Sequence, residues 1–534
     1  MTRFNLMIKN ARIIDGTGNP SFHGDVGIKD GKIAAVERQI TGDDADEIID
    51  AQGLAAAPGF IDPHTHDDLY VLEYPSADAK ILQGITTVMA GNCGYSVAPL
   101  DPKKPDTLPS FTSLLGGKSI LNKFSDVTTV GDYLDLLEEI RLGINIGTLV
   151  GTVSLRIAAM GFDMHPPTDH ELAEMKRMVR EAMQAGAFGV SSGLIYAPGS
   201  YASTEELVEL AKSAAEYDGI YASHIRGEGQ EVEQSVAEAI HIGEKAGLPV
   251  QISHFKSSGK INWGKTRETV NLVYEARKRG LDVTADQYPY TASSTGLFSF
   301  LPTAYLSEGF ESLQKKLADP AFRAQLKADI VSPNNLESNL VTTGFKAILV
   351  TISPSFPEFV GRNIQDVADE LHKDPYEVLF DIIEKDGMAA VGVFFSMSDE
   401  DVEYVMRQPF IMMGSDGLPN FSATKIHPRM TGTAPRILGY YVREKGIIPL
   451  EDAVRKMTSL PAQTFGFKGK GLLKPGFDAD VTLFDPATII DKSTYETPFK
   501  PPVGIPYVIV NGKVAVRQGD VTGCGSGKVL RHNA

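Results

Sequence analysis

Apolar residues in the middle of the chain form eight short continuous runs, many of them separated by longer amphipathic stretches. The runs are GFIDPHTH, GITTVMAGNCG, NIGTLVGTV, AFGVSSG, GIYASHI, PVQISHF, DVTADQYPY and PFIMMGSDG. Runs that are apolar on both faces and spaced by helices are typical of parallel strands covered on both sides. Eight such units predict an α/β fold of the TIM-like (β/α)8 barrel type. An open doubly wound sheet is the alternative, although no glycine-rich phosphate-binding fingerprint follows the first run.

The two ends of the chain have a different texture, with near period-two alternation broken by Gly and Asp. LMIKNARIID lies near the N-terminus, and ADVTLFDPATII and VIVNGKVAVRQGDV lie near the C-terminus. This pattern predicts strands and hairpins, and chain ends often lie close together in space. We therefore expect residues 1–57 and 467–534 to form one small β-sandwich domain, with the barrel spanning residues 58–466.

Two segments between these ends can be delimited further. TDHELAEMKRMVREAMQAG predicts an amphipathic helix with Thr168 as its N-cap and Gly186 as its stop signal. Residues 307–388 do not follow the strand and helix repeat. We expect this segment to be an insertion between the last two strand units that covers the barrel mouth as a lid.

Composition narrows the class of protein. The chain has 534 residues, a net charge of -17 and only two cysteines, Cys93 and Cys524. The acidic balance argues against a nucleic-acid surface, which needs a basic face, and two cysteines cannot build a disulfide framework. The N-terminus lacks the apolar core of a signal peptide, and no run of about 20 apolar residues appears. We expect a cytoplasmic protein without nucleic-acid or membrane partners; its oligomeric state is not predicted.

Potential metal ligands follow the predicted strands where these end. The residues are His64, His66, Cys93, His224, His254 and Asp416. In a barrel all carboxyl strand ends open onto one face, and residues i and i+2 of a strand point the same way. Imidazole, thiolate and carboxylate are the donors that zinc favours. A single histidine at a strand end is more often structural, but the joint pattern predicts a metal site.

Several motifs together resemble a known family. PGFIDPHTHDD resembles the first-strand signature of the amidohydrolase superfamily. GNCG, SHIRGEG, ISHFKSSG, QYPYTASST, GSDG and HPRMTGTAPRILG resemble the N-acyl-D-amino-acid deacylase (D-aminoacylase) family within it, almost end to end. The fourth run, AFGVSSGLIYAPG, lacks the lysine that hydantoinase-like and dihydroorotase-like relatives use to bridge two metals.

The resemblance implies a set of roles. A tight zinc would be held by Cys93, His224 and His254, and a second, weaker site would consist of His64, His66 and Asp416. Zinc lowers the pKa of its water to about 7, so that hydroxide can attack an amide carbonyl. Asp416 would act as general base and then as general acid towards the leaving amine. The reaction would be hydrolysis of an N-acyl-D-amino acid to a carboxylate and a free D-amino acid, of the EC 3.5.1 type.

The substrate would meet a second group of residues. Arg429 of HPR matches the family's clamp for the α-carboxylate, which guanidinium binds bidentately. Tyr288 and Ser294 resemble further substrate contacts. Lys256 would face the same side as His254 if the strand continues, because the two are two residues apart.

The side-chain preference and the alternatives stay open at the level of sequence. GLFSFLP follows QYPYTASST without an arginine, so neutral, apolar D-amino acids are expected; Leu297, Phe298 and Phe300 could equally belong to the core of the lid. A cyclic amide hydrolase such as a hydantoinase is one alternative, against which the missing lysine speaks. A metal-binding scaffold without catalysis is another, against which Asp416 and Arg429 speak.

Overall fold

Nine short strands, each parallel to its neighbours, form the middle of the molecule and divide into two ladders. The computed structural model describes residues 3–42, 44–100, 127–332, 339–420 and 423–532. The first ladder holds β6 (Phe60–Asp62), β7 (Ile85–Ala90) and β8 (Asn145–Thr148). The second holds β9 (Val150–Gly151), β10 (Gly189–Gly193), β11 (Ile220–His224), β12 (Val250–Ile252), β13 (Val283–Gln287) and β17 (Ile411–Met413).

The hydrogen bonds do not resolve these strands as one closed barrel, but the two ladders adjoin at both edges. Only Leu149 separates β8 from β9, so one chain segment serves both ladders. At the other edge, the Asp416 amide donates to the His64 carbonyl over 2.8 Å, and the His66 amide donates to the Gly417 carbonyl over 3.0 Å. The eight apolar runs of the sequence all carry these strands, with the third run divided between β8 and β9.

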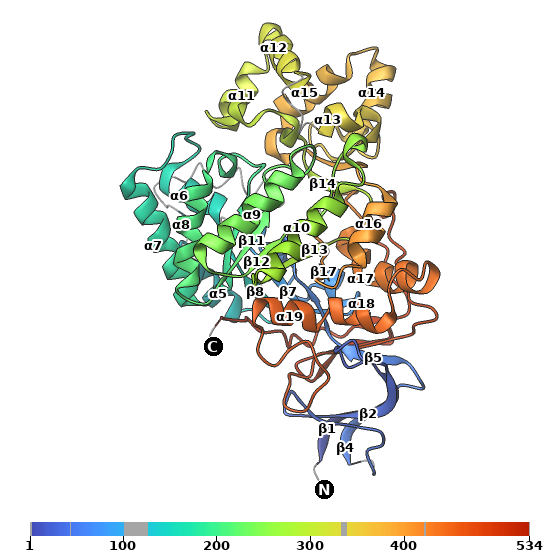
Figure 1. Cartoon of the computed structure of the whole chain (residues 1–534). Coiled ribbons are helices and arrows are strands. Elements are labelled where there is room, and N and C mark those ends of the chain that lie inside the picture. Colours follow the sequence, from blue (N-terminus) through green and yellow to red (C-terminus); the bar gives the residue numbers. More distant parts are fainter. Residues whose placement is uncertain (1–2, 43, 101–126, 333–338, 421–422, 533–534) are drawn as a thin grey trace.

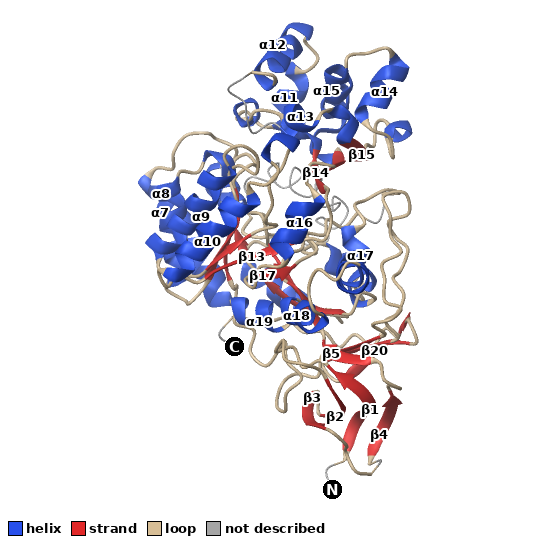
Figure 2. Cartoon of the chain, turned by 45° about the vertical axis from the view of Figure 1, so that its right-hand side comes forward, coloured by secondary structure: helices blue, strands red, loops and turns tan. Residues whose placement is uncertain are grey.

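Helices alternate with the strands and lie on the outside of the ladders (Figures 1 and 2). Those beside the second ladder are α6 (Thr152–Met160), α7 (Asp169–Ala185), α8 (Thr204–Ala215), α9 (Val232–Ala246), α10 (Thr266–Lys278) and α16 (Asp399–Met406). The boundaries of α7 confirm the sequence prediction: Thr168 and Glu171 form a capping box, and Gly186 ends the helix in the left-handed conformation.

Among the described residues of this part, further helices join the first ladder or follow β17. They are α1 (Tyr70–Glu73), α2 (Asp78–Ile81), α5 (Val130–Glu138), α17 (Arg429–Arg436), a π-helix (Ile437–Glu444), α18 (Leu450–Lys456) and α19 (Ser459–Phe465). Within the described ranges, none of the helices combines the length and the apolar character that crossing a membrane requires.

Strands from both chain ends form one nine-stranded sheet, as the sequence predicts. Its members are β1 (Phe4–Ile13), β2 (Phe22–Lys29), β3 (Lys32–Glu37), β4 (Ala45–Asp50), β5 (Ala55–Pro58), β18 (Val481–Phe484), β19 (Tyr507–Val510), β20 (Lys513–Arg517) and β21 (Asp520–Val521). β5 uses both of its edges, pairing with β1 on one side and with β18 on the other. The hydrogen bonds therefore unite the strands in a single sheet and do not divide them into the two sheets of the expected sandwich.

Between β13 and β17 the chain leaves the ladders and builds the upper part of Figure 1. Its antiparallel strands are β14 (Ser293–Gly296), β15 (Ile348–Ile352) and β16 (Val391–Phe394). Its helices include α11 (Phe310–Lys316), α12 (Pro320–Ile330), α13 (Asn339–Thr343), α14 (Ile364–Leu371) and α15 (Pro375–Asp386). The expected insertion, residues 307–388, contains these helices and β15, whereas β14 and β16 bracket it.

Candidate metal centre and active site

The six predicted ligand residues lie at or just beyond the carboxyl ends of strands. β11 ends at His224 itself, whereas β6 and β12 stop before His64 and His254. Cys93, His254 and Asp416 have positive φ values of 53°, 36° and 48°. Residues with a Cβ rarely adopt this conformation, and such positions cluster at functional sites. The alternation of side chains in a strand therefore does not decide where these ligands point; the sharp turns after the strands do.

Cys93, His224 and His254 bring three donor atoms together. His254 Nε2 lies 2.8 Å from His224 Nδ1 and 3.6 Å from Cys93 Sγ. The three donor atoms all lie within 4.8 Å of one another, and all three residues are buried. This is the trio to which the resemblance assigns the tight zinc.

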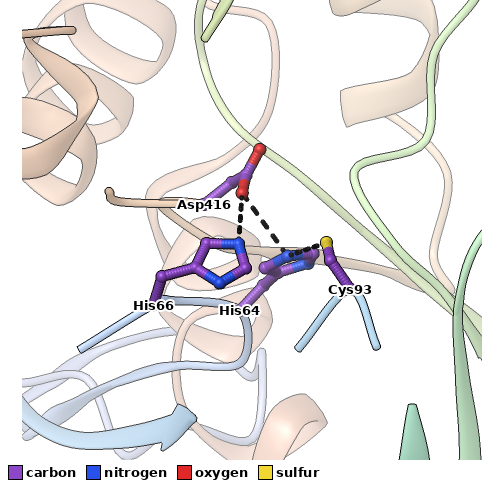
Figure 3. Close-up of side chains that lie close together, drawn as sticks. All are labelled: His64, His66, Cys93 and Asp416. Carbon is purple, nitrogen blue, oxygen red and sulfur yellow. Dashed lines mark hydrogen bonds and ion pairs between the residues drawn. The ribbon is translucent and has the colours of Figure 1, made fainter. Parts of the chain in front are cut away.

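His64, His66 and Asp416 form a second group that shares Cys93 with the first. Asp416 Oδ1 lies 3.5 Å from His64 Nε2 and 3.3 Å from His66 Nε2. Cys93 Sγ lies 3.3 Å from His64 Nε2. Figure 3 shows the Asp416 carboxylate facing both rings, with Cys93 beside His64. The structure thus brings all six predicted residues into one cluster; their role as ligands stays a prediction.

The chemistry of the cluster fits a zinc ion. Cys93 Sγ has two imidazole Nε2 atoms, of His64 and His254, within 3.6 Å. Sulfur and nitrogen donors that converge on one point are the set that structural and catalytic zinc sites use. The cluster contains two such groups, joined by the cysteine, and can hold one ion or two.

The electrostatics of the cluster favour the ligating forms of its acids. Burial raises the pKa of Cys93, but the charges of His64 and His254 outweigh it and hold the pKa well below its ordinary value. Burial likewise raises the pKa of Asp416, and Arg429 and His64 more than reverse this, so that the pKa lies well below 3.8. A thiolate and a carboxylate are the protonation states that bind a metal.

Glu228, which the sequence left without a role, lies behind the first group. Its Oε1 is 3.2 Å from His254 Nδ1 and 3.6 Å from His224 Nε2. Lys256 Nζ donates to the same oxygen over 2.5 Å. β12 ends at Ile252, so the condition under which Lys256 would face the same side as His254 is not met; the chain turns at His254, where φ is positive.

Asp286, at the end of β13, has the corresponding place behind the second group. Its Oδ2 lies 3.1 Å from His64 Nδ1, and its Oδ1 accepts from the His254 amide over 2.9 Å. Gln251 donates to the same carboxylate. Carboxylates in this position fix the orientation and tautomer of a ligating histidine. Sequence reasoning missed Asp286, although a carboxylate inside the apolar run DVTADQYPY was a usable signal.

The predicted carboxylate clamp lies beside Asp416. Arg429 is only 1% exposed, and its Nη1 lies 2.8 Å from Asp416 Oδ2. Its Nη2 donates to the Ser294 carbonyl over 3.1 Å, and its guanidinium carbon lies 4.7 Å from the centre of the Tyr288 ring. The structure therefore places Arg429, Tyr288 and Ser294 together at the edge of the metal cluster.

The cluster opens into a cavity of about 430 Å³. The three cations among its lining residues each have a carboxylate partner: Arg226–Glu238 at 2.9 Å, Lys256–Glu228 at 2.5 Å and Arg429–Asp416 at 2.8 Å. The cavity is therefore bounded by paired charges and by apolar side chains such as Ile195, Phe300 and Leu418.

The part of the chain that covers the cavity differs from the expected lid. Residues 299–303 and Phe394 line it, and none of the described residues between 307 and 388 does. Leu297, Phe298 and Phe300 of GLFSFLP all belong to the main hydrophobic core, and of these three only Phe300 also lines the cavity. This part of the wall is built by β14, the turns after it and Phe394 of β16.

A cavity at the carboxyl ends of parallel strands, beside a cluster of Cys, His and Asp that could hold a metal ion, is an arrangement typical of metal-dependent hydrolases of the α/β class. Residues 47–516 match the model of the amidohydrolase family. Three relatives from Alcaligenes xylosoxydans xylosoxydans cover nearly the whole chain. They are a D-aminoacylase (37% identical, covering 99% of this chain and 98% of the relative), an N-acyl-D-glutamate deacylase (36%, 100% and 97%) and an N-acyl-D-aspartate deacylase (36%, 97% and 93%).

The chain belongs to the D-aminoacylase, or N-acyl-D-amino-acid deacylase, family of the amidohydrolase superfamily. It is an amidohydrolase of the D-aminoacylase type, which confirms the resemblance found in the sequence.

Solved structures agree with this assignment. An N-acyl-D-glutamate deacylase from Bordetella bronchiseptica, complexed with zinc and a phosphonate mimic of the tetrahedral intermediate, is 36% identical, with a TM-score of 0.84 over 99% of this chain and 100% of that one. A D-aminoacylase described as having a binuclear metal centre is 34% identical, with a TM-score of 0.82 over 99% of this chain and 100% of that one.

Proposed function

We propose that the two parallel ladders are the two parts of one (β/α)8 barrel within residues 58–466. The sheet from residues 1–57 and 467–534 and the insertion 307–388 are units attached to it. The support lies at the two places where the ladders adjoin, at Leu149 and between residues 64–66 and 416–417. In this arrangement all the strand ends that carry the cluster open onto one face.

Cys93, His224 and His254 are the residues that would hold a zinc ion, and His64, His66 and Asp416 would form a second, weaker site. When bound, zinc supplies a Lewis acid and lowers the pKa of a water molecule to about 7. The donor set of the first group, and the zinc in the similar Bordetella structure, support this assignment.

The substrate we assign is an N-acyl-D-amino acid, hydrolysed at its amide bond. The observation that carries this is the ion pair between Arg429 and Asp416, 2.8 Å apart at the wall of the cavity. Arg429 would bind the substrate's α-carboxylate, with Tyr288 and Ser294 beside it; Lys256 Nζ lies 5.7 Å from the centre of the same Tyr288 ring. Asp416 then lies next to the amide, where it accepts a proton from water and delivers it to the leaving amine.

Neutral, apolar side chains are the preference that the cavity supports. An acidic substrate carries two carboxylates, so besides drawing Arg429 away from Asp416 it would have to break a second ion pair of the cavity, Arg226–Glu238 or Lys256–Glu228. Phe300, Ile195 and Leu418 instead offer apolar surface. The three relatives differ in their named substrates while being about equally similar, so identity alone does not decide among these preferences.

A hydrolysis panel tests the substrate. We expect the zinc-loaded protein to release the amino acid from N-acetyl derivatives of D-leucine, D-methionine and D-phenylalanine, at a kcat/KM at least about tenfold above those of N-acetyl-D-glutamate and N-acetyl-D-aspartate, because one unpaired charge in the cavity costs more than about 1.4 kcal/mol. Products are followed by chiral chromatography, which detects either enantiomer of the free amino acid as well as opening of a hydantoin ring. N-acetyl-L-amino acids and hydantoins serve as controls.

Three outcomes would contradict parts of the proposal. Activity confined to hydantoins, or to L-substrates, would refute the reaction and chirality assigned above. A preference for the glutamate or aspartate derivative would refute only the side-chain assignment. Stoichiometric zinc binding without activity on any member of the panel would support the non-catalytic scaffold.

A further inference from the structure

His427, two residues before the proposed carboxylate clamp, is buried and makes two specific hydrogen bonds. Its Nδ1 accepts from the Arg429 amide over 3.0 Å, and its Nε2 lies 3.0 Å from the Ala292 carbonyl. The first bond requires a lone pair on Nδ1, and the second requires a proton on Nε2. Only the neutral tautomer with its proton on Nε2 satisfies both partners.

The two bonds connect the elements that carry Arg429 and Ser294. Arg429 is the first residue of α17, and Pro428 before it provides no side-chain cap. His427 therefore supplies the acceptor for the amide at the start of this helix. Its other bond holds Ala292, just before β14, and Ser294 of β14 in turn accepts from Arg429 Nη2 over 3.1 Å.

The ring of His427 is fixed from the sides. Tyr290 meets it edge-on with centroids 5.0 Å apart, and Tyr495 does so at 5.2 Å. Burial and the nearby Arg429 lower the pKa of His427 well below 6.5, in agreement with the neutral ring that the hydrogen bonds require. The imidazole is thus held in one orientation and one tautomer between the clamp and the cavity wall.

We propose that His427 is a positioning residue for substrate binding, which sets the location of the Arg429 guanidinium relative to the β14 wall of the cavity. The inference rests on the proposed role of Arg429 as the clamp for the substrate's α-carboxylate. His427 lies outside the metal cluster and would act through Arg429 alone. Its loss should therefore affect binding of the carboxylate more than the chemical step.

Two substitutions separate the two bonds. In His427→Asn the side-chain oxygen takes a position like that of Nδ1 and can still accept from the Arg429 amide. In His427→Gln the side-chain nitrogen reaches like Nε2 and can still donate to the Ala292 carbonyl. We expect each variant to raise KM for N-acetyl-D-leucine roughly five- to tenfold, about the worth of one hydrogen bond, with kcat changed less than about threefold.

The matched substrate is the primary amide of N-acetyl-D-leucine, which lacks the carboxylate. Its kcat/KM should change by less than about twofold in both variants, because it does not use the clamp. Tyr495→Phe, which keeps the ring contact and both bonds of His427, is the control variant and should match the wild type. Binding of free D-leucine to the zinc-loaded protein, measured by calorimetry, should weaken in parallel with KM.

Arg429→Ala distinguishes failure of the inference from failure of the proposed function. If Arg429→Ala lowers kcat/KM equally for N-acetyl-D-leucine and for its primary amide, the role of Arg429 as carboxylate clamp is refuted. If Arg429→Ala lowers kcat/KM more for N-acetyl-D-leucine than for its amide while His427→Asn and His427→Gln do not, the positioning role of His427 is refuted. The positioning role would also be overturned, in favour of a general structural role, if the His427 variants lost kcat/KM equally on the acid and the amide. Loss of bound zinc in these variants would have the same meaning.

The wild-type protein offers a test that does not depend on folding of a variant. Nitrogen chemical shifts of labelled histidine report the tautomer of each ring. We expect His427, assigned by the signal missing from His427→Asn or His427→Gln, to remain neutral with its proton on Nε2 between about pH 6 and about pH 9. A ring protonated on Nδ1 in that range would overturn the inference, because Nδ1 could not then accept from the Arg429 amide.

Discussion

A single oxygen of Glu228 faces both histidines of the first metal group. Glu228 Oε1 lies 3.2 Å from His254 Nδ1 and 3.6 Å from His224 Nε2. Burial alone would raise the pKa of Glu228, but Lys256 and His224 lower it far below 4.5, so the group is a carboxylate. At the scale of the residue, this one carboxylate places a negative charge beside two of the three residues to which the tight zinc is assigned, while Lys256 Nζ lies 2.9 Å from His254 Nδ1.

Glu228→Gln should weaken zinc binding by about 10- to 100-fold, the usual effect of losing a carboxylate behind a ligating histidine. The amide keeps the size of the side chain but loses the negative charge that faces the two rings. Competition with a chromophoric chelator measures the affinity directly, without reference to activity.

Glu238→Gln is the control for this experiment. Glu238 pairs with Arg226, which also lines the cavity, but it has no contact with the proposed zinc ligands. Its variant should bind zinc as the wild type does. Equal zinc affinities in Glu228→Gln and the wild type would remove Glu228 from the metal centre.

At the scale of the element, helix α18 is tied to the start of β17 by a buried lysine. Lys456 is 0% exposed and donates to the carbonyls of Gln408 and Ile411. Burial lowers the pKa of Lys456 to about 8; Asp452 opposes this shift and Arg455 adds to it. The folded state therefore disfavours the charged form that the unfolded chain keeps up to a pKa of 10.5.

The sign of the resulting pH dependence follows from proton binding. Between about pH 8 and about pH 10 the unfolded chain binds more protons at this residue than the folded one, so the free energy of unfolding rises with pH. Lys456→Met lacks this titration. We expect the stability of the wild type relative to Lys456→Met to increase by about 1–3 kcal/mol as pH rises through this window, measured by urea unfolding.

Lys513→Met, which replaces an exposed lysine of β20, is the matched control. The difference in free energy of unfolding between Lys513→Met and the wild type should stay constant with pH. If the difference in free energy of unfolding between Lys456→Met and the wild type were also constant with pH, burial would not disfavour the charged form of Lys456.

At the scale of the whole molecule, the metal cluster joins segments that are far apart in the chain. Its donors follow β6, β7, β11, β12 and β17, from His64 to Asp416. A metal that binds only the folded state stabilises it by mass action, by about 4 kcal/mol at a thousandfold excess over its dissociation constant. The sheet from the chain ends is attached through a separate contact, in which Asn145 of β8 donates to Asp480 beside β18 over 3.0 Å.

Removal of metal with a chelator should therefore lower Tm of the whole chain by several degrees, and added zinc should restore it. Calorimetry with and without chelator measures the shift. In His254→Ala, which lacks one proposed ligand, the shift should be much smaller. An unchanged Tm of the wild type on chelation would show that a bound metal does not couple the strand ends.

The sequence by itself determined which segments form the central strands and which six residues make up the metal cluster. Periodicity located the eight apolar runs and the limits of α7, because burial on both faces and helix capping are local constraints on residue type. The positions of His64, His66, Cys93, His224, His254 and Asp416 at strand ends follow from the same runs. The family motifs then supplied the reaction class.

Only the tertiary structure decided how these residues meet. The i, i+2 rule would have applied to Lys256 only if the strand continued, but β12 ends at Ile252 and the chain turns at His254, whose φ is positive. Glu228 contacts His254, and His427 contacts Ala292, across long stretches of chain, and no local pattern records these contacts. Pairing of strands from the two chain ends, through both edges of β5, likewise depends on long-range hydrogen bonds that residue type alone does not specify.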